Sequence, residues 1–101
     1  MTDNDDNKKT PETFAYVLDE LIKSADRKTT VTSFADQIGK GSTTVYEWLK
    51  GERLPDQYDI REVIEASVII ISNKDKKREF KLRLKNGFMF DFEKRARLDD
   101  I

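Results

Sequence analysis

The stretch Ser33–Pro55, SFADQIGKGSTTVYEWLKGERLP, limits what this chain can fold into more than any other. Its apolar residues recur at helical spacing in two short segments, which predicts two short helices. Gly39 lies between the segments, where a helix-ending residue with positive φ is expected. Gly51 and Pro55 then end the second helix. We therefore expect a helix, a tight turn and a second helix over 42–50.

A third helix has to cover this pair, because two short helices cannot enclose a core by themselves. Thr10–Glu12 has the features of a helix start: a capping residue, a proline and an acid in the first turn. The apolar residues that follow recur at i, i+3, i+4, i+7, i+8 and i+11, which predicts a helix over 11–24 or 11–25 with one buried stripe. The stripe consists of Phe14, Val17, Leu18, Leu21, Ile22 and Ala25. Thr30 or Thr32 is expected to cap the next helix.

The central stretch resembles the helix-turn-helix of the Cro/CI-type (xenobiotic-response-element-like) bacterial and phage regulators. That family shows apolar-Ala, apolar-Gly, Thr-apolar-x-x-Trp and Gly-x-x-x-Pro in succession. This chain meets the pattern without a gap at Phe34-Ala35, Ile38-Gly39, Thr44-Val45, Trp48, Gly51 and Pro55. It departs from the family at Lys40, where an apolar residue is usual, and at Gly41, where Ser or Thr is usual.

The resemblance implies a sequence-specific DNA-binding regulator of transcription, expected to be a repressor, that binds double-stranded DNA as a homodimer on an inverted repeat. The helix over 42–50 would enter the major groove, because Val45 and Trp48 point inward and leave its polar residues outside. Carried over from the family, the base-reading residues are Ser42, Thr43 and Glu47. The expected positions at the margin or on phosphates are Thr32, Thr44, Tyr46, Lys50 and Arg53.

After Pro55, Asp56 is expected to cap a helix over 57–66 whose inner side includes Tyr58, Val63 and Ile64. The end of this helix is ambiguous, since helical spacing continues to Ile71. The run Val68–Ile71 is nevertheless β-branched throughout, which favours a short strand over 68–72.

Two runs of alternating apolar residues flank Asn86-Gly87, which is a hairpin signal. The apolar members are Phe80, Leu82, Leu84, Phe88, Phe90 and Phe92. A two-residue loop would scatter them over both faces. A three-residue loop over 85–87, with Gly87 left-handed, places all six on one face, and we therefore expect that register.

These elements predict an α+β fold, in which a four-helix helix-turn-helix domain over 10–67 precedes a small C-terminal antiparallel sheet over 68–94. Residues 1–9 are expected to be a disordered arm and residues 95–101 a frayed tail. The six apolar residues of the hairpin exceed what the N-terminal helix can cover. A second copy of the chain is therefore expected to cover part of that face.

Composition excludes several kinds of chemistry. The chain has no Cys and no His, which rules out disulfides, thiolate metal sites and imidazole acid–base catalysis. We find no nucleophile–base pair and no cluster of converging carboxylates, so we expect no enzyme, no metal and no cofactor. A membrane span and a signal peptide are also missing from the pattern, and a cytoplasmic location is expected.

The charge distribution keeps a second function open. Residues 30–67 carry four basic and seven acidic side chains, whereas residues 68–101 carry ten and six. DNA-binding domains usually show a basic footprint, and the net charge here is −1. The alternative is the same fold acting as a protein-interaction module, such as an antitoxin or antirepressor with little DNA affinity. The basic run over 74–85 is either a solvated face or a further source of phosphate contacts.

Overall fold

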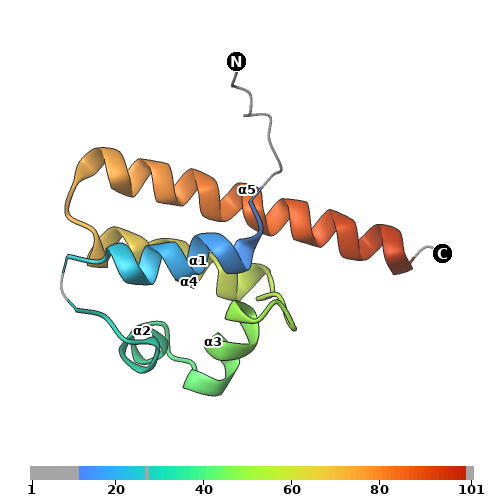
Figure 1. Ribbon diagram of the computed structural model, residues 1–101, viewed down its shortest axis with the longest axis horizontal. Helices are drawn as coiled ribbons and strands as arrows, with labels where there is room; N and C mark the ends of the chain where they lie inside the picture. Colours follow the sequence, from blue (N-terminus) through green and yellow to red (C-terminus); the bar gives the residue numbers. More distant parts are fainter. Residues whose placement is uncertain (1–11, 27, 100–101) are drawn as a thin grey trace, which may run out of the picture.

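The computed structural model describes residues 12–26 and 28–99, and within these residues it contains five α-helices and no strand. The helices are α1 (Phe14–Ser24), α2 (Val31–Gln37), α3 (Ser42–Leu49), α4 (Gln57–Ile70) and α5 (Lys74–Asp99). α5 packs along α1 and α4, while α2 and α3 lie on the other side of those two helices (Figure 1). The expected α+β class is therefore wrong, because the C-terminal third is a helix and not a sheet. The expected arm over 1–9 lies outside the described residues.

Five of the six residues of the N-terminal stripe are buried as predicted, whereas Ala25, the C-cap of α1, is half-buried, and the helix begins later than expected. Thr13 is the N-cap of α1, and its hydroxyl accepts a hydrogen bond from the backbone nitrogen of Tyr16 at 3.2 Å. The helix therefore starts at Phe14, three residues after the predicted first position. The stripe residues that are buried in the core are Phe14, Val17, Leu18, Leu21 and Ile22.

The helix, turn and helix at the centre of the chain are confirmed. Thr30, and not Thr32, caps α2, in a capping box with Ser33 in which each side chain bonds the other residue's backbone nitrogen. Gly39 and Gly51 have φ values of +73° and +78°, which a residue with a Cβ rarely adopts. Gly41 is the N-cap of α3, and it supplies no side-chain hydrogen bond.

The strand expected over 68–72 is wrong, because α4 continues to Ile70. Val63 and Ser67 are completely buried on one side of α4, and the Ser67 hydroxyl donates to the carbonyl of Ile64 at 2.6 Å. Burial of this face outweighs the low helix propensity of β-branched residues, which costs only a few tenths of a kcal/mol for each residue. Tyr58 is 72% exposed and does not line the inner side of the helix as predicted.

The expected hairpin is wrong as well. α5 is a single helix of 26 residues, and the predicted tail from 95 to 99 belongs to it. Phe80, Leu84 and Phe88 recur at i, i+4 and i+8, and these three are buried. Leu82 and Phe92 are 59% and 50% exposed, and Phe90 is half-buried. The six residues predicted to share one dimer face are therefore divided between the core and the surface.

Gly87, expected to form the turn, lies within α5 instead. The residue is buried, and a Cβ built on it would lie 3.0 Å from the backbone nitrogen of Phe14. Glycine costs about 1 kcal/mol in the middle of a helix relative to alanine. Here it allows α5 to cross the start of α1 closely, so it serves helix packing and not a hairpin.

Two hydrogen bonds connect the loop after α1 to the turn between α4 and α5, at the other end of the molecule. The amide of Asp26 donates to the carbonyl of Ile70 at 3.0 Å, and the amide of Ser72 donates to the Asp26 carboxylate at 2.9 Å. The end of α1 is thereby fixed to the turn between α4 and α5.

Among the helices of residues 12–26 and 28–99, none combines the length and the apolar character needed to cross a membrane.

Candidate nucleic-acid interface

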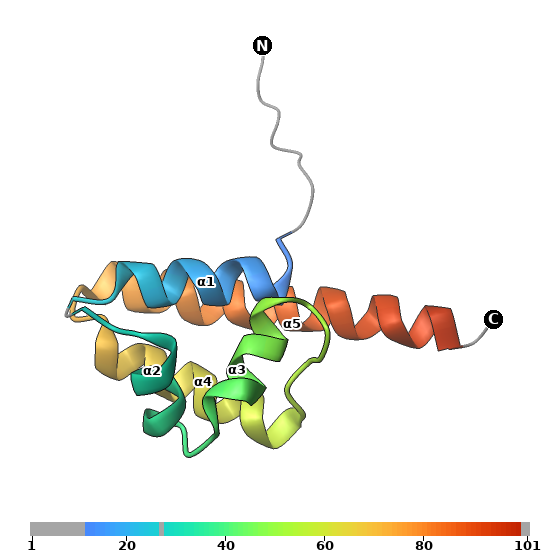
Figure 2. The ribbon, with the colours of Figure 1, turned by 60° about the horizontal axis from the view of Figure 1, so that its bottom comes forward.

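α3 divides its residues between the core and the surface as its spacing predicts. Val45 is completely buried and Trp48 almost completely. The Trp48 ring packs edge-on against the Phe14 ring, with 6.4 Å between the two centroids. Thr43 and Lys50 are exposed, and Tyr46 is 48% exposed. α3 lies with α2 on the side of α1 and α4 that faces away from the N-terminal half of α5 (Figures 1 and 2). The polar face of α3 is thus available to a partner.

The three residues expected to read bases lie on this face, with different degrees of access. Thr43 is exposed, whereas Ser42 and Glu47 are half-buried. Thr43, Glu47 and Lys50 are spaced at i, i+4 and i+7, which places them on one side of the helix. Thr44, expected at the margin, is half-buried.

Glu47 forms an ion pair with Arg53, at 2.9 Å between Arg53 Nη1 and Glu47 Oε1. The pair neutralises a carboxylate that would otherwise repel a phosphate backbone next to α3. It also holds Arg53, expected on phosphates, close to the end of the helix. Lys50 is the C-cap of α3, and Thr32 is an exposed residue of α2.

Lys40, one of the departures from the family pattern, has a partner of its own. Its Nζ lies 3.0 Å from Oδ1 of Asp59, whose side chain is 13% exposed. The backbone nitrogen of Asp59 in turn donates to Asp56, the N-cap of α4. An ion pair therefore fastens the turn between α2 and α3 to the first turn of α4, at the position where the family usually has an apolar side chain.

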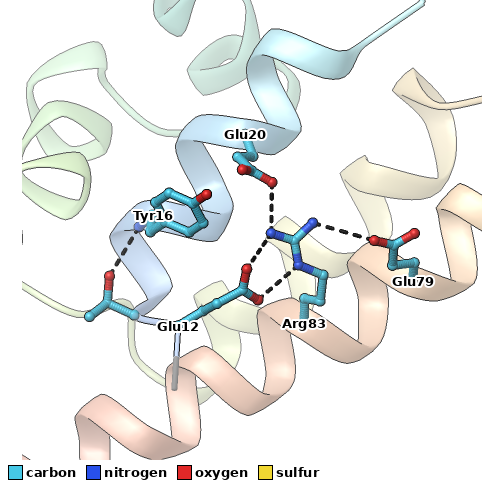
Figure 3. Close-up of polar contacts among 6 residues, drawn as sticks. Glu12, Tyr16, Glu20, Glu79 and Arg83 are labelled. Carbon is cyan, nitrogen blue, oxygen red and sulfur yellow. Dashed lines mark hydrogen bonds and ion pairs between the residues drawn. The ribbon is translucent and has the colours of Figure 1, made fainter. Parts of the chain in front are cut away.

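Arg83 lies in the middle of the basic run, and its guanidinium is bound within a cluster of carboxylates (Figure 3). Its guanidinium donates to both carboxylate oxygens of Glu12, at 2.9 and 2.6 Å, and to Glu20 at 2.7 Å. Hydrogen bonds to Glu12 raise the pKa of Arg83 above its usual value, and Glu20 adds to the effect. A hydrogen bond with the Tyr16 hydroxyl makes the largest contribution to lowering the pKa of Glu20, and a hydrogen bond with Arg83 lowers it further. No local signal predicts this cluster, since the acidic partners on the α1 side lie more than sixty residues away.

The rest of the basic run occupies the N-terminal half of α5, which Figures 1 and 2 place away from α2 and α3. The C-terminal half of α5 instead passes the loop that follows α3. Arg95 Nη2 donates to the carbonyl of Gly51 at 3.0 Å, and Figure 2 shows that loop reaching α5. Lys94 and Arg95 are therefore cations beside the loop after α3, and no sequence pattern had indicated them.

No family model, no curated protein and no solved structure matches this chain. In the described part of the chain, no group of three or more Asp and Glu side chains is arranged to hold a metal ion. Function therefore has to be inferred from α2, the turn, α3 and their surroundings.

Proposed function

We propose that this protein is a sequence-specific DNA-binding regulator of transcription, acting as a repressor in the cytoplasm, and that α3 enters the major groove. The observation that carries the proposal is the exposed polar face of α3. Buried Val45 and Trp48 fix the phase of that face, and the turn at Gly39, with its φ of +73°, sets the direction of the helix. The resemblance to the Cro/CI-type pattern supports the same function.

The dimensions of α3 suit this task. An α-helix with its side chains is about 10–12 Å across, and the major groove, about 12 Å wide, admits it. Ser42 and Thr43 lie in the first turn, the part of a recognition helix that reaches base edges. Lys50 stands at the other end, where the groove is bordered by phosphates. Hydroxyl groups donate or accept, so the base preference at these positions is expected to be broad.

We propose further that two copies bind an inverted repeat, each with its α3 in one major groove. The hairpin face first expected to join them does not exist. α5 extends beyond the body of the molecule (Figures 1 and 2), and on it Phe92 is 50% and Met89 49% exposed. The Phe92 ring stacks on Phe88, with 6.0 Å between centroids. A second copy that covers these residues would remove an apolar surface from water, in an interface that is the same for both partners.

The alternative function is a protein-interaction module, and one observation favours it. The segment 30–67 has a net charge of −3, and within it Asp36 of α2 and Glu52 after α3 are exposed. Such carboxylates repel phosphates and suit a basic protein partner. The two functions differ in what α3 contacts, so one binding experiment separates them.

The experiment is selection of bound duplexes from a pool of random sequence by the full chain. Enrichment of one inverted repeat supports a dimeric, sequence-specific regulator. Recovery of a single half-site supports DNA reading without the dimer. Recovery of the unenriched pool, or of nothing, would contradict sequence-specific binding and favour the protein-interaction module.

A further inference from the structure

A cavity of about 510 Å³ lies where the loop after α3, the start of α1 and the C-terminal half of α5 meet. Four of its lining residues are cationic, namely Lys50, Arg53, Lys94 and Arg95. Two of them follow the recognition helix directly and two come from α5. Trp48, the one tryptophan of the chain, also lines the cavity.

Three contacts hold this part of α5 in place. Gly87 packs against the Phe14 backbone, and Asp91 accepts a hydrogen bond from the amide of Phe14 at 2.9 Å. A carboxylate at the N-terminus of a helix is favourable, because the first amides of α1 have no partners within the helix. Arg95 then bonds the Gly51 carbonyl at 3.0 Å. Lys94 therefore stands on a fixed segment of helix and not on a free tail.

The charges in the cavity favour an anion. Among the residues that the structure describes, Asp91 is the one acidic residue that lines it, and its carboxylate accepts a hydrogen bond from the amide of Phe14 at the start of α1. Arg53 is partly neutralised by Glu47. Within the described residues, Lys50 and Lys94 form no ion pair, and both are exposed. An incoming anion thus meets two lysines whose charges are not already compensated.

We propose that this cavity binds a phosphate of the DNA backbone at the edge of the groove that α3 enters, and that Lys94 of α5 contributes to this contact. The inference rests on the proposed DNA binding and extends it to a helix outside the helix-turn-helix. Ammonium and guanidinium groups both donate strong hydrogen bonds to phosphate oxygens. In helix-turn-helix docking the first turn of α3 meets the base edges, so the residues at its C-terminal end lie nearer to the backbone of the duplex. Basic side chains of α5 thereby offset the acidic balance of segment 30–67.

The test compares Lys94→Gln with Lys76→Gln in the full chain. Both lysines are exposed and lie on α5, and both changes remove one positive charge, but Lys76 lies at the far end of the helix. The probe is a double-stranded oligonucleotide of random sequence, whose affinity is measured at several salt concentrations. Lys94→Gln should reduce the slope of log K against log salt by about 0.9, the loss expected for one phosphate contact. Lys76→Gln should leave the slope as in the unmodified protein.

Trp48 gives a second readout that does not depend on affinity. Its fluorescence should change on binding of the duplex, because it lines the cavity, and the change should be smaller in Lys94→Gln. Inorganic phosphate, tested at matched ionic strength, separates a backbone site from a site for small anions. A saturable response to inorganic phosphate with none to the duplex would overturn the proposal.

The outcomes also separate this inference from the proposed function. If the duplex binds and Lys94→Gln has the slope of the unmodified protein, the phosphate site on α5 is refuted while DNA binding stands. Equal reductions in both variants would refute it too, because they would show a diffuse charge effect along α5. If no duplex binds under any condition, the proposed function itself fails.

Discussion

Gly87 of α5 lies against the backbone of Phe14 at the start of α1, so closely that a Cβ on the glycine would stand 3.0 Å from the Phe14 nitrogen and 3.1 Å from its Cα. The neighbour is backbone and not a flexible side chain, so one of the two helices has to move to accept a larger residue. This contact decides how α5 crosses α1. It also positions the C-terminal half of α5 beside α3.

Gly87→Ala should therefore destabilise the fold, by about 1–3 kcal/mol, as overpacking usually does. The change gains up to about 1 kcal/mol in helix propensity, which is smaller than the cost of separating the helices. Asn86→Ala is the matched control, since Asn86 is exposed and precedes Gly87 on the same helix. Urea unfolding measures both. A Gly87→Ala protein as stable as the control would show that the crossing is looser than described.

Trp48→Ala should cost about 3–5 kcal/mol of stability, because the indole is 1% exposed and packs against Phe14. Exposed Tyr46→Ala, on the same helix, should change stability far less. Thermal unfolding compares the two variants. A tryptophan that fluoresces in the unmodified protein at the wavelength of free indole would contradict this burial and the assigned face of α3.

Thr43→Ala should weaken binding to the selected DNA site by about 1–3 kcal/mol if the hydroxyl reads a base. Its thermal midpoint should stay unchanged, because Thr43 is exposed. Ser72→Ala removes an exposed hydroxyl from the turn between α4 and α5 and should leave binding intact. Fluorescence anisotropy with the selected site and a scrambled one checks both variants. Equal loss on the two DNAs would assign Thr43 to backbone contact and not to base reading.

The Arg83 cluster predicts a loss of stability in acid. Hydrogen bonding to Tyr16 and Arg83 lowers the pKa of Glu20 from its ordinary 4.5, so the folded state favours the ionised carboxylate. The resulting stabilisation is complete above about pH 4.5 and disappears as the pH falls through the lowered pKa of the folded state. Because the side chain is 37% exposed, the contribution should not exceed about 1 kcal/mol.

Glu20→Gln removes this contribution, and unfolding by urea at several pH values measures it. The variant should be less stable than the unmodified protein at pH 7, and the difference should shrink in acid. Glu65→Gln, at an exposed position of α4, is the control and should follow the unmodified protein. A difference for Glu20→Gln that is the same at pH 7 and in acid would rule out the carboxylate as its cause.

Phe92→Lys should abolish a dimer held by the exposed part of α5, because it places a charge in an apolar interface. The domain itself should remain folded, since Phe92 is 50% exposed. Tyr58→Lys, at a 72% exposed aromatic residue of α4, should leave the assembly unchanged. Sedimentation equilibrium at micromolar concentration distinguishes the states. An unmodified protein that is already monomeric on its own and on DNA would contradict the dimer.

The sequence by itself determined the helix-turn-helix, because its boundaries are set by neighbouring residues. Gly39 and Gly51 end their helices through positive φ, and the apolar spacing of Val45 and Trp48 fixes the face of α3. Each of these effects acts within one or two turns of chain. The polar residues of the proposed DNA interface could therefore be selected before the fold was known.

Tertiary structure decided the last third of the chain. Alternating apolar residues around Asn86-Gly87 satisfy a hairpin, but Phe80, Leu84 and Phe88 also satisfy a helix, and local spacing does not choose between them. The choice falls to packing: α1 accepts Gly87 against its backbone, and the carboxylates of Glu12 and Glu20 bind Arg83 from more than sixty residues away. The same crossing of α5 over α1 brings Lys94 and Arg95 beside the loop after α3. The spacing of apolar residues along the chain carries no information about the surface on which a segment will pack. In this protein, packing on that surface made the C-terminal segment a helix.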